Sequence, residues 1–458
     1  MSAVPAHQPN PHLFYPPHAR PLKGDEGFLR ATWKFIQNPV EGLGPLSYNQ
    51  PITSAPIIGS GFRRIRLHVV SDPAGMDTIL STHARNFSKA PIDHRILGPA
   101  TKEGLLSVHG EQWKRQRKAV APIFRPRHVE HLAGLITEVV DEYAAGLGAG
   151  AELELNSAMA ELTFDVLAKA LLGDPKGIDG ARLKVATRNV VTGAGTLRPD
   201  DLIPFPRWVP RPMAPKGARA LKELKAAADA LIDSRDPDDP GDDLVGLIVG
   251  TGLTAREQRD NLIGFFIAGH ETTALTLTWA LYLLGRAPDM AARVREEVES
   301  VAGAGSLGYA HTQHMPVTQA VIDETMRLYP PAPLINRECQ VETEVCGRIV
   351  EPNDHCLLAN YIMHRTERLW EDPHSFDPDR FLRDPSLKAK GAPFKPWGGG
   401  PRICVGMAFA TVESLIALGT LVRDFDIHIG EEVYPKPVMT VTLRPEGGVP
   451  ARLVRRRT

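Results

Sequence analysis

The chain has 458 residues, of which 43% are hydrophobic, so it can bury a large core. Its 53 lysines and arginines nearly balance its 54 aspartates and glutamates, which argues against a protein that binds nucleic acid or an acidic surface. The four cysteines are too few and too irregularly spaced for a disulfide scaffold or a zinc ribbon, so we expect a reducing compartment, the cytoplasm.

The first 24 residues, MSAVPAHQPNPHLFYPPHARPLKG, are rich in proline. They lack the apolar core of a signal peptide and the apolar length of a membrane anchor, so we expect a tail or wrap on a soluble protein. The remainder shows no internal repeat and no linker that would separate two domains. Residues 1–458 are therefore expected to form a single domain, with residues 1–24 as its N-terminal tail.

The first clear strand pattern is GFRRIRLHVVSD, residues 61–72, and a short helical pattern follows in PAGMDTILSTHA. From about residue 111 to residue 301 most segments repeat hydrophobic residues every 3.6 positions, which predicts helices. Exposed loops are expected at residues 193–215 and at SRDPDDPGDD. Strand patterns return at EVCGRIV, HCLLANYIM and VMTVTLRP. The expected fold class is mainly α with a minor β-rich region.

The best-defined helix begins at Thr254, which forms a capping-box pattern with Glu257 ahead of a long apolar run. If the helix continues to Gly285, it is about 48 Å long at about 1.5 Å per residue. Its apolar segment LIGFFIAGHETTALTLTWALYLL is long enough to span a membrane. However, His270 and Glu271 at its centre would be unfavourable in lipid, so we expect a buried central helix.

The middle of this helix, AGHETT, places the small residues Ala268 and Gly269 beside Glu271 and Thr272. Gly269 weakens the helix, and a threonine hydroxyl can bond to a carbonyl one turn earlier. Close packing against a neighbour, with an ordinary polar interruption, would explain the segment. A functional role is the alternative, because an acid and two threonines inside a buried helix are unfavourable without a use.

Two further motifs carry charges on predicted helices. In VIDETMRLYPPAP, Glu324 and Arg327 lie three residues apart on one face, and Arg380 of FDPDRF could complete a Glu–Arg–Arg cluster. In HGEQWKRQRK, Trp113 and Arg117 lie four residues apart among other basic residues. A solvated surface pair and a basic amphipathic helix are the commoner explanations of these two patterns.

The segment GAGSLG, residues 303–308, matches the dinucleotide-binding pattern GxGxxG. That mechanism needs a strand before the glycines and a helix N-terminus after them. Here the charged helical pattern ARVREEVESVA precedes the segment, so we expect a flexible loop.

The segment PWGGGPRICVGMAF, residues 396–409, crowds glycines and a proline around Cys404 directly before an apolar helix. Glycines let the backbone approach something flat, and a helix N-terminus favours a thiolate. Zinc would need three or four clustered ligands, and no other cysteine or histidine lies within twenty residues. A catalytic nucleophile and a structural cysteine stay open, but neither explains a glycine-lined surface. A single thiolate under a flat metal macrocycle does.

Together these motifs resemble the cytochrome P-450 superfamily, and in particular a soluble bacterial-type member. WGGGPRICVG is similar to its cysteine loop, AGHETT to its oxygen-binding helix segment, ETMR to its E-x-x-R motif and WKRQR to its W-x-x-x-R motif. The motifs occur in the family's order from about residue 60 to the C-terminus. The resemblance implies the cytochrome P-450 fold, with haem between the long central helix and the cysteine-loop helix.

The resemblance also implies roles for individual residues. Cys404 would be the axial ligand of the iron in haem b, iron protoporphyrin IX. The residues expected to bind the haem, mostly at its propionates, are Trp113, Arg117, Arg337 and Arg402, with His109, Ala268 and Trp397 as further cofactor contacts. The expected structural triad behind the haem is Glu324, Arg327 and Arg380.

One residue departs from the family's pattern. Seven residues before the cysteine, where the family usually has phenylalanine, this chain has Trp397. A buried indole N–H needs an acceptor, and we consider two, the sulfur of Cys404 and a backbone carbonyl. A hydrogen bond to the sulfur would raise the haem reduction potential, whereas a bond to a carbonyl would change packing alone.

The reaction that the resemblance implies is monooxygenation, in which dioxygen supplies one oxygen atom to a hydrophobic small molecule. Thr272 would hydrogen-bond the bound oxygen and Glu271 would help to deliver protons. The expected substrate pocket contains parts of APIDHRILGPATKEGLL together with Gly264, Ile267, Ala268, Ala332 and Leu334.

Electrons would come from separate proteins, because the sequence has no iron–sulfur cysteine set and no flavin or nucleotide fold. We expect a ferredoxin or flavodoxin with its NAD(P)H reductase. The basic residues Lys114, Arg115 and Lys118 could form the docking face, although a plain solvated face explains them as well.

Two alternatives are retained. A peroxide-driven hydroxylase or a haem-thiolate isomerase would keep the haem, but such relatives commonly lose the acid–threonine pair that is intact here. A non-enzymatic haem sensor or carrier would need no such pair and usually has an output module, which we do not find in the sequence.

Overall fold

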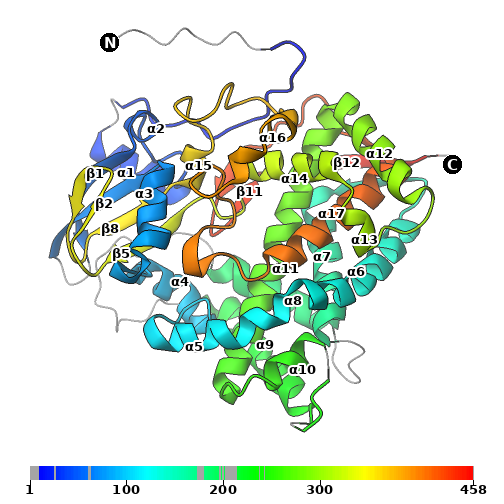
Figure 1. The fold of residues 1–458 in the computed structure, drawn as a ribbon, viewed down its shortest axis with the longest axis horizontal. Helices are drawn as coiled ribbons and strands as arrows, with labels where there is room; N and C mark the ends of the chain where they lie inside the picture. The colour runs from blue at the N-terminus through cyan, green and yellow to red at the C-terminus, as the bar shows by residue number, and fades with distance from the viewer. Residues whose placement is uncertain are drawn as a thin grey trace.

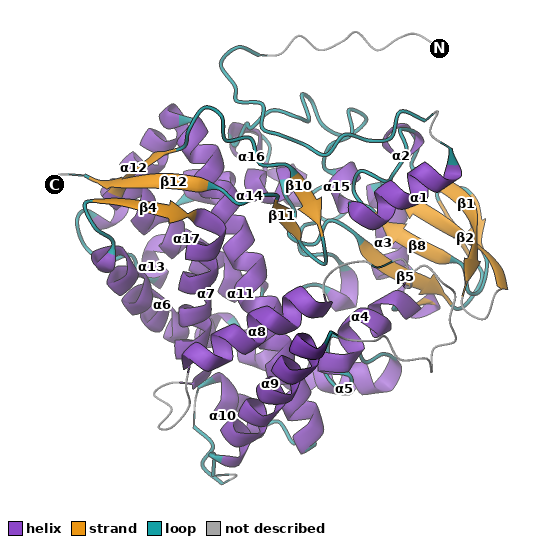
Figure 2. Ribbon diagram, turned by 180° about the vertical axis from the view of Figure 1, so that it is seen from behind, coloured by secondary structure: helices purple, strands orange, loops and turns teal. Residues whose placement is uncertain are grey.

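The computed structural model describes residues 10–24, 27–59, 63–172, 180–194, 198, 201, 214–236, 238–241 and 243–456. Helices form most of this part of the chain, and the largest sheet lies to one side of them (Figures 1 and 2). The predicted fold class, mainly α with a minor β-rich region, is confirmed. Most of the loop expected at residues 193–215 lies outside the described residues.

The α-helices, in chain order, are α1 (Phe28–Gln37), α2 (Leu46–Asn49), α3 (Pro73–Asp77), α4 (Pro91–Thr101), α5 (Gly110–Val120), α6 (Pro126–Gly146), α7 (Leu155–Leu172), α8 (Gly180–Ala194), α9 (Pro215–Asp233), α10 (Leu244–Val249), α11 (Ala255–Arg286), α12 (Pro288–Ala302), α13 (Tyr309–Thr312), α14 (Pro316–Leu328), α15 (Asn360–Met363), α16 (Asp379–Arg383) and α17 (Met407–Asp424). The strands are β1 (Ile52–Gly59), β2 (Arg63–Val70), β3 (Phe87–Ser88), β4 (Gly150–Glu154), β5 (Ile335–Cys339), β6 (Thr343–Val345), β7 (Arg348–Val350), β8 (His355–Leu358), β9 (Phe425–His428), β10 (Pro437–Met439), β11 (Leu443–Pro445) and β12 (Pro450–Arg455).

The largest sheet has five strands in the order β1-β2-β8-β5-β3. Only the pair β2–β8 is parallel, so the strand predicted near residue 61 joins a segment almost 300 residues later. The segment EVCGRIV forms the hairpin β6–β7, and VMTVTLRP forms β10–β11. HCLLANYIM divides into strand β8 and the helical turn α15, which corrects its interpretation as one strand.

The long helix α11 is the centre of the molecule, as Figure 1 shows. Its capping box is confirmed, since the Thr254 hydroxyl accepts a hydrogen bond from the Glu257 N–H and the Glu257 carboxylate accepts one from the Thr254 N–H. Most of its residues are buried against α7, α9, α14 and α17. Within the described residues, no helix has the combined length and apolar content needed to cross a membrane.

The GAGSLG segment connects α12 to α13 and follows a helix, so its interpretation as a loop holds. The described part of the N-terminal segment, residues 10–24, lies against the body of the protein. Phe14 forms an isolated bridge with Phe376, and the Ala19 N–H donates to the hydroxyl of Tyr361 over 2.8 Å. This segment is therefore a wrap rather than a free tail.

Candidate active site

The structure brings the three residues of the expected triad together behind the cysteine loop. Arg327 on α14 donates two hydrogen bonds of 2.7 Å to the carboxylate of Glu324, one to each oxygen. Arg380 on α16 donates to the same carboxylate over 3.1 Å. All three side chains are buried, and a bidentate arginine fixes the relative position of two elements better than a point charge does.

Arg327 also connects this carboxylate to the chain that leads to the cysteine loop. It donates hydrogen bonds to the backbone carbonyls of His364, Pro373 and Ser375, so all five of its N–H groups have acceptors. Burial lowers its pKa, and the neighbouring Glu324 acts in the opposite direction. The cluster therefore determines the local course of residues 364–380.

The cysteine loop turns sharply at its glycines. Gly400 has φ +62°, and a Cβ atom there would lie 1.8 Å from the carbonyl oxygen of Leu80, so only glycine fits this position. The Cys404 N–H donates to the carbonyl of Trp397 over 3.0 Å, which closes the loop. The loop ends three residues before α17, so Cys404 lies just ahead of the helix N-terminus.

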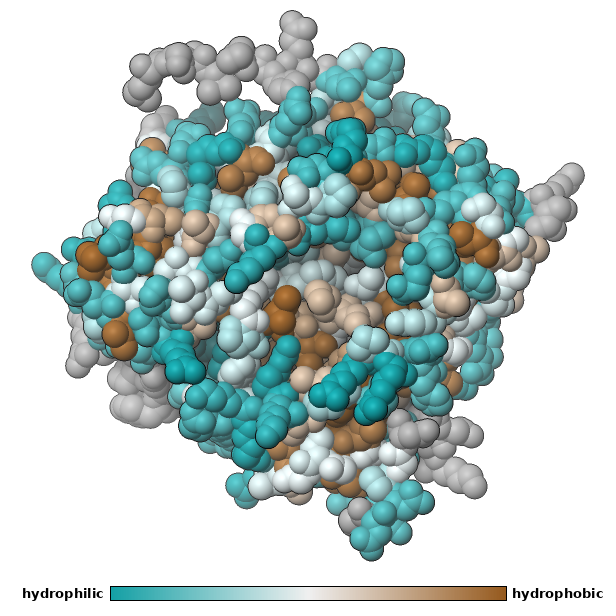
Figure 3. All heavy atoms as spheres, in the orientation of Figure 1, coloured by the Kyte–Doolittle hydropathy of each residue, from teal (hydrophilic) through white to brown (hydrophobic). Residues whose placement is uncertain are grey.

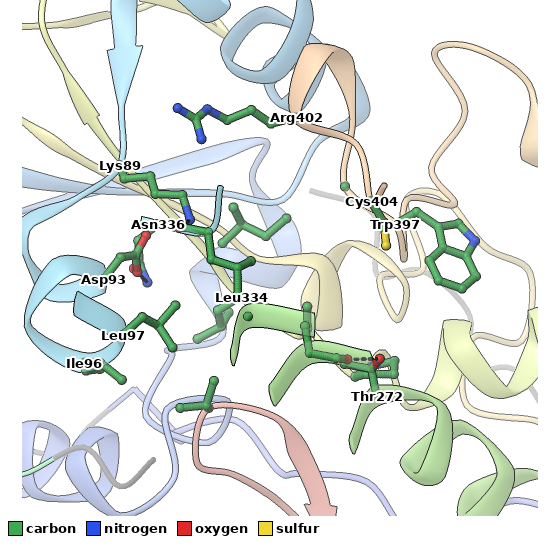
Figure 4. Close-up of a pocket in the computed structure, with 18 of the residues that line it drawn as sticks. Lys89, Asp93, Ile96, Leu97, Thr272, Leu334, Asn336, Trp397, Arg402 and Cys404 are labelled. Carbon is green, nitrogen blue, oxygen red and sulfur yellow. Dashed lines mark hydrogen bonds between the residues drawn. The ribbon is translucent and has the colours of Figure 1, made fainter. Parts of the chain in front are cut away.

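The sulfur of Cys404 borders a cavity of about 660 Å³. Figure 4 shows it pointing into the space between the cysteine loop and α11. Burial within the protein raises the pKa of Cys404, while a hydrogen bond from the Gly406 amide and the charge of Arg117 act to lower it. Figure 3, in the orientation of Figure 1, shows a hollow near the middle of this face of the molecule, with hydrophobic residues inside it and hydrophilic ones around its rim.

The walls of the cavity come from segments far apart in the sequence. They include the cysteine loop, the middle of α11, helices α4 and α5, strand β5 and the turn between β10 and β11. Volumes of this order suit a small organic ligand or cofactor. A Cβ added to Gly406 would meet no atom within 4 Å, so the space beside the cysteine is open to a flat group.

Three guanidinium groups gather on the cavity wall, from Arg117, Arg337 and Arg402. Burial lowers the pKa of each, and that of Arg402 falls to about 10 because the other two cations also lie near it. Within the described part of the chain, none of the three forms an ion pair with a carboxylate. Arg337 is buried, and Arg117 and Arg402 are half-buried. Cations withdrawn from water without a salt-bridge partner are unfavourable, so this wall fits a ligand that carries two carboxylates, as the haem of the expected fold does.

Trp113 also lines the cavity, and the Arg402 guanidinium lies 4.4 Å from the centre of its ring. The expected contact at His109 is not found. His109 is the N-cap of α5 and packs edge-on against His94, with ring centres 5.8 Å apart, and it is not among the described residues that line the cavity. His109 has an extended backbone and lies outside the helical repeat of α5, so the one-turn spacing does not place its side chain on the face of Trp113.

On the opposite wall, α11 presents Gly264, Ala268 and Thr272 to the cavity. The Thr272 hydroxyl donates to the Ala268 carbonyl over 2.8 Å, the backward bond expected from AGHETT. Ile267 was expected in the pocket, but it packs against the hydrophobic core instead, because one residue rotates a helix position by about 100°.

Ala332 and Leu334, after α14, line the cavity as expected, and so do several residues of α4 and of the segment that follows it. Two polar wall residues, Lys89 and Asn336, were not expected from the sequence, and Asp93 was not singled out within the expected segment APIDHRILGPATKEGLL; all three are labelled in Figure 4. Asn336 donates to the Asp93 carboxylate over 3.0 Å. Burial lowers the pKa of Lys89 to about 8. A buried lysine in a segment without a motif gives no pattern to search for.

Glu271 does not reach the cavity. Its carboxylate accepts hydrogen bonds from the Arg444 guanidinium, one of them 2.9 Å long, and from the hydroxyl of Thr442. Both partners lie at β11, and Glu271 is not among the described cavity residues. Glu271 and Thr272 are adjacent in the sequence, but their side chains leave α11 in different directions. Thr272 faces the cavity, whereas Glu271 faces the β10–β11 hairpin.

Trp397 lines the cavity beside the cysteine. No hydrogen bond to the Cys404 sulfur is found for its indole N–H among the described residues, and Figure 4 shows the ring nitrogen on the edge turned away from the sulfur. This geometry argues against the sulfur as acceptor, and a bond from the indole N–H to a backbone carbonyl is likewise not found among the described residues.

Comparison with known proteins agrees with this geometry. The family model Cytochrome P450 matches residues 53–449. The chain belongs to the cytochrome P450 family. Cyclooctatin synthase of Streptomyces melanosporofaciens is 31% identical over 77% of this chain and 79% of its own length. The putative cytochrome P450 132 of Mycobacterium bovis is 29% identical over 94% of this chain and 97% of its own length.

A crystal structure of a six-coordinated cytochrome P450 from Thermus thermophilus has a TM-score of 0.70 and 25% identity, covering 89% of this chain and 96% of that one. The predicted cytochrome P450 fold is thus confirmed. As a cytochrome P450, the chain is a haem-dependent monooxygenase that uses dioxygen and a redox partner. When bound, haem supplies the chemistry that activates dioxygen, and the protein supplies the ligand, the orientation and the protons.

Proposed function

We propose that this cytochrome P450 binds haem b through Cys404 and inserts one oxygen atom from dioxygen into a hydrophobic or amphipathic small molecule. The observation that carries the proposal is a cavity that has the Cys404 sulfur on one wall and the small residues of α11 on the other. A ligand clamped between these walls would meet the sulfur on one face and the substrate space on the other. We also propose that residues 1–458 act as one domain.

The charges on the wall support the orientation of this haem. Arg117, Arg337 and Arg402, with Trp113, would hold the two propionates, since these cations are half-buried or buried and none forms a salt bridge with a carboxylate of the described residues. Ala268 and Trp397 would contact the ring. Glu324, Arg327 and Arg380 would hold the chain behind the cysteine loop, a positioning role that their mutual hydrogen bonds support.

The space above the haem would hold the substrate against Gly264, Ala268, Ala332 and Leu334. These residues are apolar or small, which favours an apolar substrate surface. Thr272 would hold the oxygen that reacts, by turning its hydroxyl from the Ala268 carbonyl toward the cavity. A proton-delivery role for Glu271 would require its release from Arg444.

We propose a ferredoxin or flavodoxin, with its NAD(P)H reductase, as the source of electrons. Of the expected docking residues, Arg115 pairs with Glu257 and Lys114 with Glu111, while Lys118 is exposed. Exposed pairs are weak, so an acidic partner could displace Glu111 from Lys114. All four cysteines are free thiols, which supports a reducing compartment, and we propose the cytoplasm.

The test begins with the reduced, carbon monoxide-bound protein. We expect the red-shifted Soret band of thiolate ligation, and its loss in Cys404→Ser. Cys346→Ser, at a half-buried cysteine in the β6–β7 turn, is the matched control and should keep the band. A histidine-type Soret band in fresh, active protein would contradict the proposal.

Substrates can then be sought by screening small-molecule libraries for the high-spin optical shift that follows displacement of water from the iron. Turnover with reduced ferredoxin, compared with turnover by peroxide alone, separates the proposed reaction from a peroxide-driven one. Binding without any turnover would indicate a sensor or carrier.

A further inference from the structure

The cavity wall carries a pair of polar side chains for which the haem site described above has no use. Asp93 lies in the first turn of α4 and Asn336 lies on β5, and the Asn336 amide donates to the Asp93 carboxylate over 3.0 Å. Both side chains line the cavity and are half-buried. Figure 4 shows the pair on the far side of the cavity from the Cys404 sulfur.

The pair interrupts an apolar part of the wall. The neighbouring wall residues are Ile92, Ile96 and Leu97 on α4, and Leu334 two residues before Asn336. A carboxylate and an amide in such surroundings are unfavourable unless their hydrogen-bonding atoms have partners. The hydrogen bonds available to these two side chains therefore need to be counted.

The described residues leave acceptors of this pair without donors. A carboxylate accepts up to about four hydrogen bonds, and Asn336 is the one donor found for the Asp93 side chain in the described part of the chain. Burial lowers the pKa of Lys89 and the charge of Asp93 acts against this, but Lys89 donates to the Leu106 carbonyl and forms no described ion pair with Asp93. The remaining acceptor positions of Asp93 are thus open to a ligand in the cavity.

Other acids near the cavity are already engaged or do not reach it. Asp201 lies 3.9 Å from the Arg95 guanidinium, and Asp260 accepts a hydrogen bond of 2.8 Å from the Glu103 N–H. Glu413 on α17, whose pKa burial raises to about 8, is not among the described cavity residues. Asp93 is therefore the carboxylate best placed to meet a ligand.

Helix stability explains only part of this arrangement. A negative charge in the first turn of a helix is favourable, so an acid at the start of α4 is expected on that ground alone. Stabilisation of α4 does not require an amide from a strand 243 residues later to contact the carboxylate at the cavity wall. The contact with Asn336 fixes the direction of the carboxylate, as a binding site requires.

We propose that the Asp93–Asn336 pair binds the polar end of the substrate, and that this end is a neutral group with a hydrogen to donate, such as a hydroxyl. The inference rests on the function proposed above and names its substrate class, an amphipathic alcohol. Asp93 repels a carboxylate end, and the three arginines of the wall are taken by the haem propionates. An ammonium end would meet the charges of Lys89 and Arg337, both of which interact with Asp93.

The position of the pair also determines how the substrate lies. With its hydroxyl at Asp93, an alcohol extends its apolar part past Leu334 toward α11 (Figure 4). Oxygen therefore enters at a carbon remote from the hydroxyl. In this reaction a C–H bond, dioxygen, two protons and two electrons from NAD(P)H, passed on by the redox partner, give a C–OH group and water.

The first test compares matched ligands by the high-spin optical shift of the haem-loaded protein. The probes are 1-decanol, 1-methoxydecane, which keeps the oxygen but has no hydrogen to donate, and decanoate. A bulkier set repeats the comparison with 4-cyclohexylcyclohexanol, its methyl ether and the corresponding carboxylate. We expect the alcohol to bind at least about tenfold more tightly than the ether or the carboxylate, the factor that one hydrogen bond to a charged group provides.

Variants then assign this preference to the pair. Asp93→Ala should abolish the difference between alcohol and ether and improve the binding of the carboxylate, and Asn336→Leu should reduce the difference. Asp289→Asn is the matched control, because Asp289 is an exposed acid in the first turn of α12 and is not among the described cavity residues. It should keep the wild-type preference.

The second test analyses the products of 1-decanol oxidation. The wild type should hydroxylate the methyl half of the chain, and Asp93→Ala should give a broader distribution along it. Equal binding of alcohol and ether, tighter binding of the carboxylate, no shift with any probe, or oxidation mainly at the hydroxyl end would overturn the inference, as would a wild-type preference in Asp93→Ala. If Asp93→Ala does not fold, Asn336→Leu decides the question. A normal thiolate Soret band without an alcohol preference marks the failure of this inference alone, whereas loss of that band marks the failure of the proposed haem site.

Discussion

Arg327→Lys should destabilise the protein strongly, although the charge is kept. Arg327 donates five hydrogen bonds, two to Glu324 and three to backbone carbonyls, and its side chain is fully buried. A lysine has three donors on one atom, so at least two acceptors lose their partner. Each buried polar group left without a partner costs about 1–3 kcal/mol, which gives a loss of about 2–6 kcal/mol in the free energy of unfolding.

The assay is urea unfolding at equal haem saturation, followed by the Soret band and by far-ultraviolet circular dichroism, with the loss taken from the midpoint shift and the slope. The matched control is Arg219→Lys on α9, where the side chain is exposed and makes one bond of 3.3 Å to Glu223. That change should remain below about 0.5 kcal/mol. A loss in Arg327→Lys below about 1 kcal/mol, or equal to the control, would refute the argument from unsatisfied acceptors.

Three further outcomes are expected. Gly400→Ala should lower stability by more than about 1 kcal/mol and weaken haem retention, since the residue has φ +62° and its Cβ would collide with the Leu80 carbonyl; normal haem content in the variant would contradict this. Trp397→Phe should leave the haem reduction potential unchanged in a redox titration, because the indole N–H faces away from Cys404. A lower potential in the variant would instead support a hydrogen bond from the indole to the sulfur. The pKa of Glu413 is raised from 4.5 to about 8, so its proton stabilises the folded state fully below about pH 4.5, and this contribution disappears as the pH rises through 8. Relative to Glu413→Gln, the wild type should therefore lose up to about 5 kcal/mol across that window in urea unfolding at each pH, and parallel curves would contradict the raised pKa.

The sequence predicted best where spacing along one helix determines the geometry. Glu324 and Arg327 lie three positions apart on a helix, so their contact follows from the helical repeat once burial is granted. The cap of α11 followed from Thr254 and Glu257 for the same reason. These are local relationships, and the chain between the residues is short and regular.

Prediction failed where a side chain's environment comes from distant segments. The position of Glu271 is determined by Arg444, which lies 173 residues later, and no pattern near AGHETT announces that partner. In the sequence, Glu413 cannot be distinguished from a glutamate on the exposed face of a helix. Only the packing of α17 against α11 shows that it is buried. Ile267 was misplaced because a helix start does not fix which face meets the cavity.

The strands of the minor sheets were also incompletely predicted. β1 and β4 contain alanine, proline, glycine and glutamate, which disfavour strands, and they form because an edge is available in the folded protein. β4 pairs with β12 near the other end of the chain, and that partner supplies the hydrogen bonds that its own composition does not favour.

The wrap formed by residues 10–24 has a consequence for the order of events during synthesis. The Tyr329 hydroxyl donates to the Pro17 carbonyl across 312 residues, the Ala19 N–H to Tyr361 across 342, and the Tyr15 hydroxyl to Asp372 across 357. At about 5–20 residues per second, these early residues leave the ribosome about 15–70 s before their partners exist. During that interval the segment has no native docking site, and its apolar and aromatic groups are available to chaperones. Attachment of this wrap therefore belongs to the last stage of folding, when the triad region has formed.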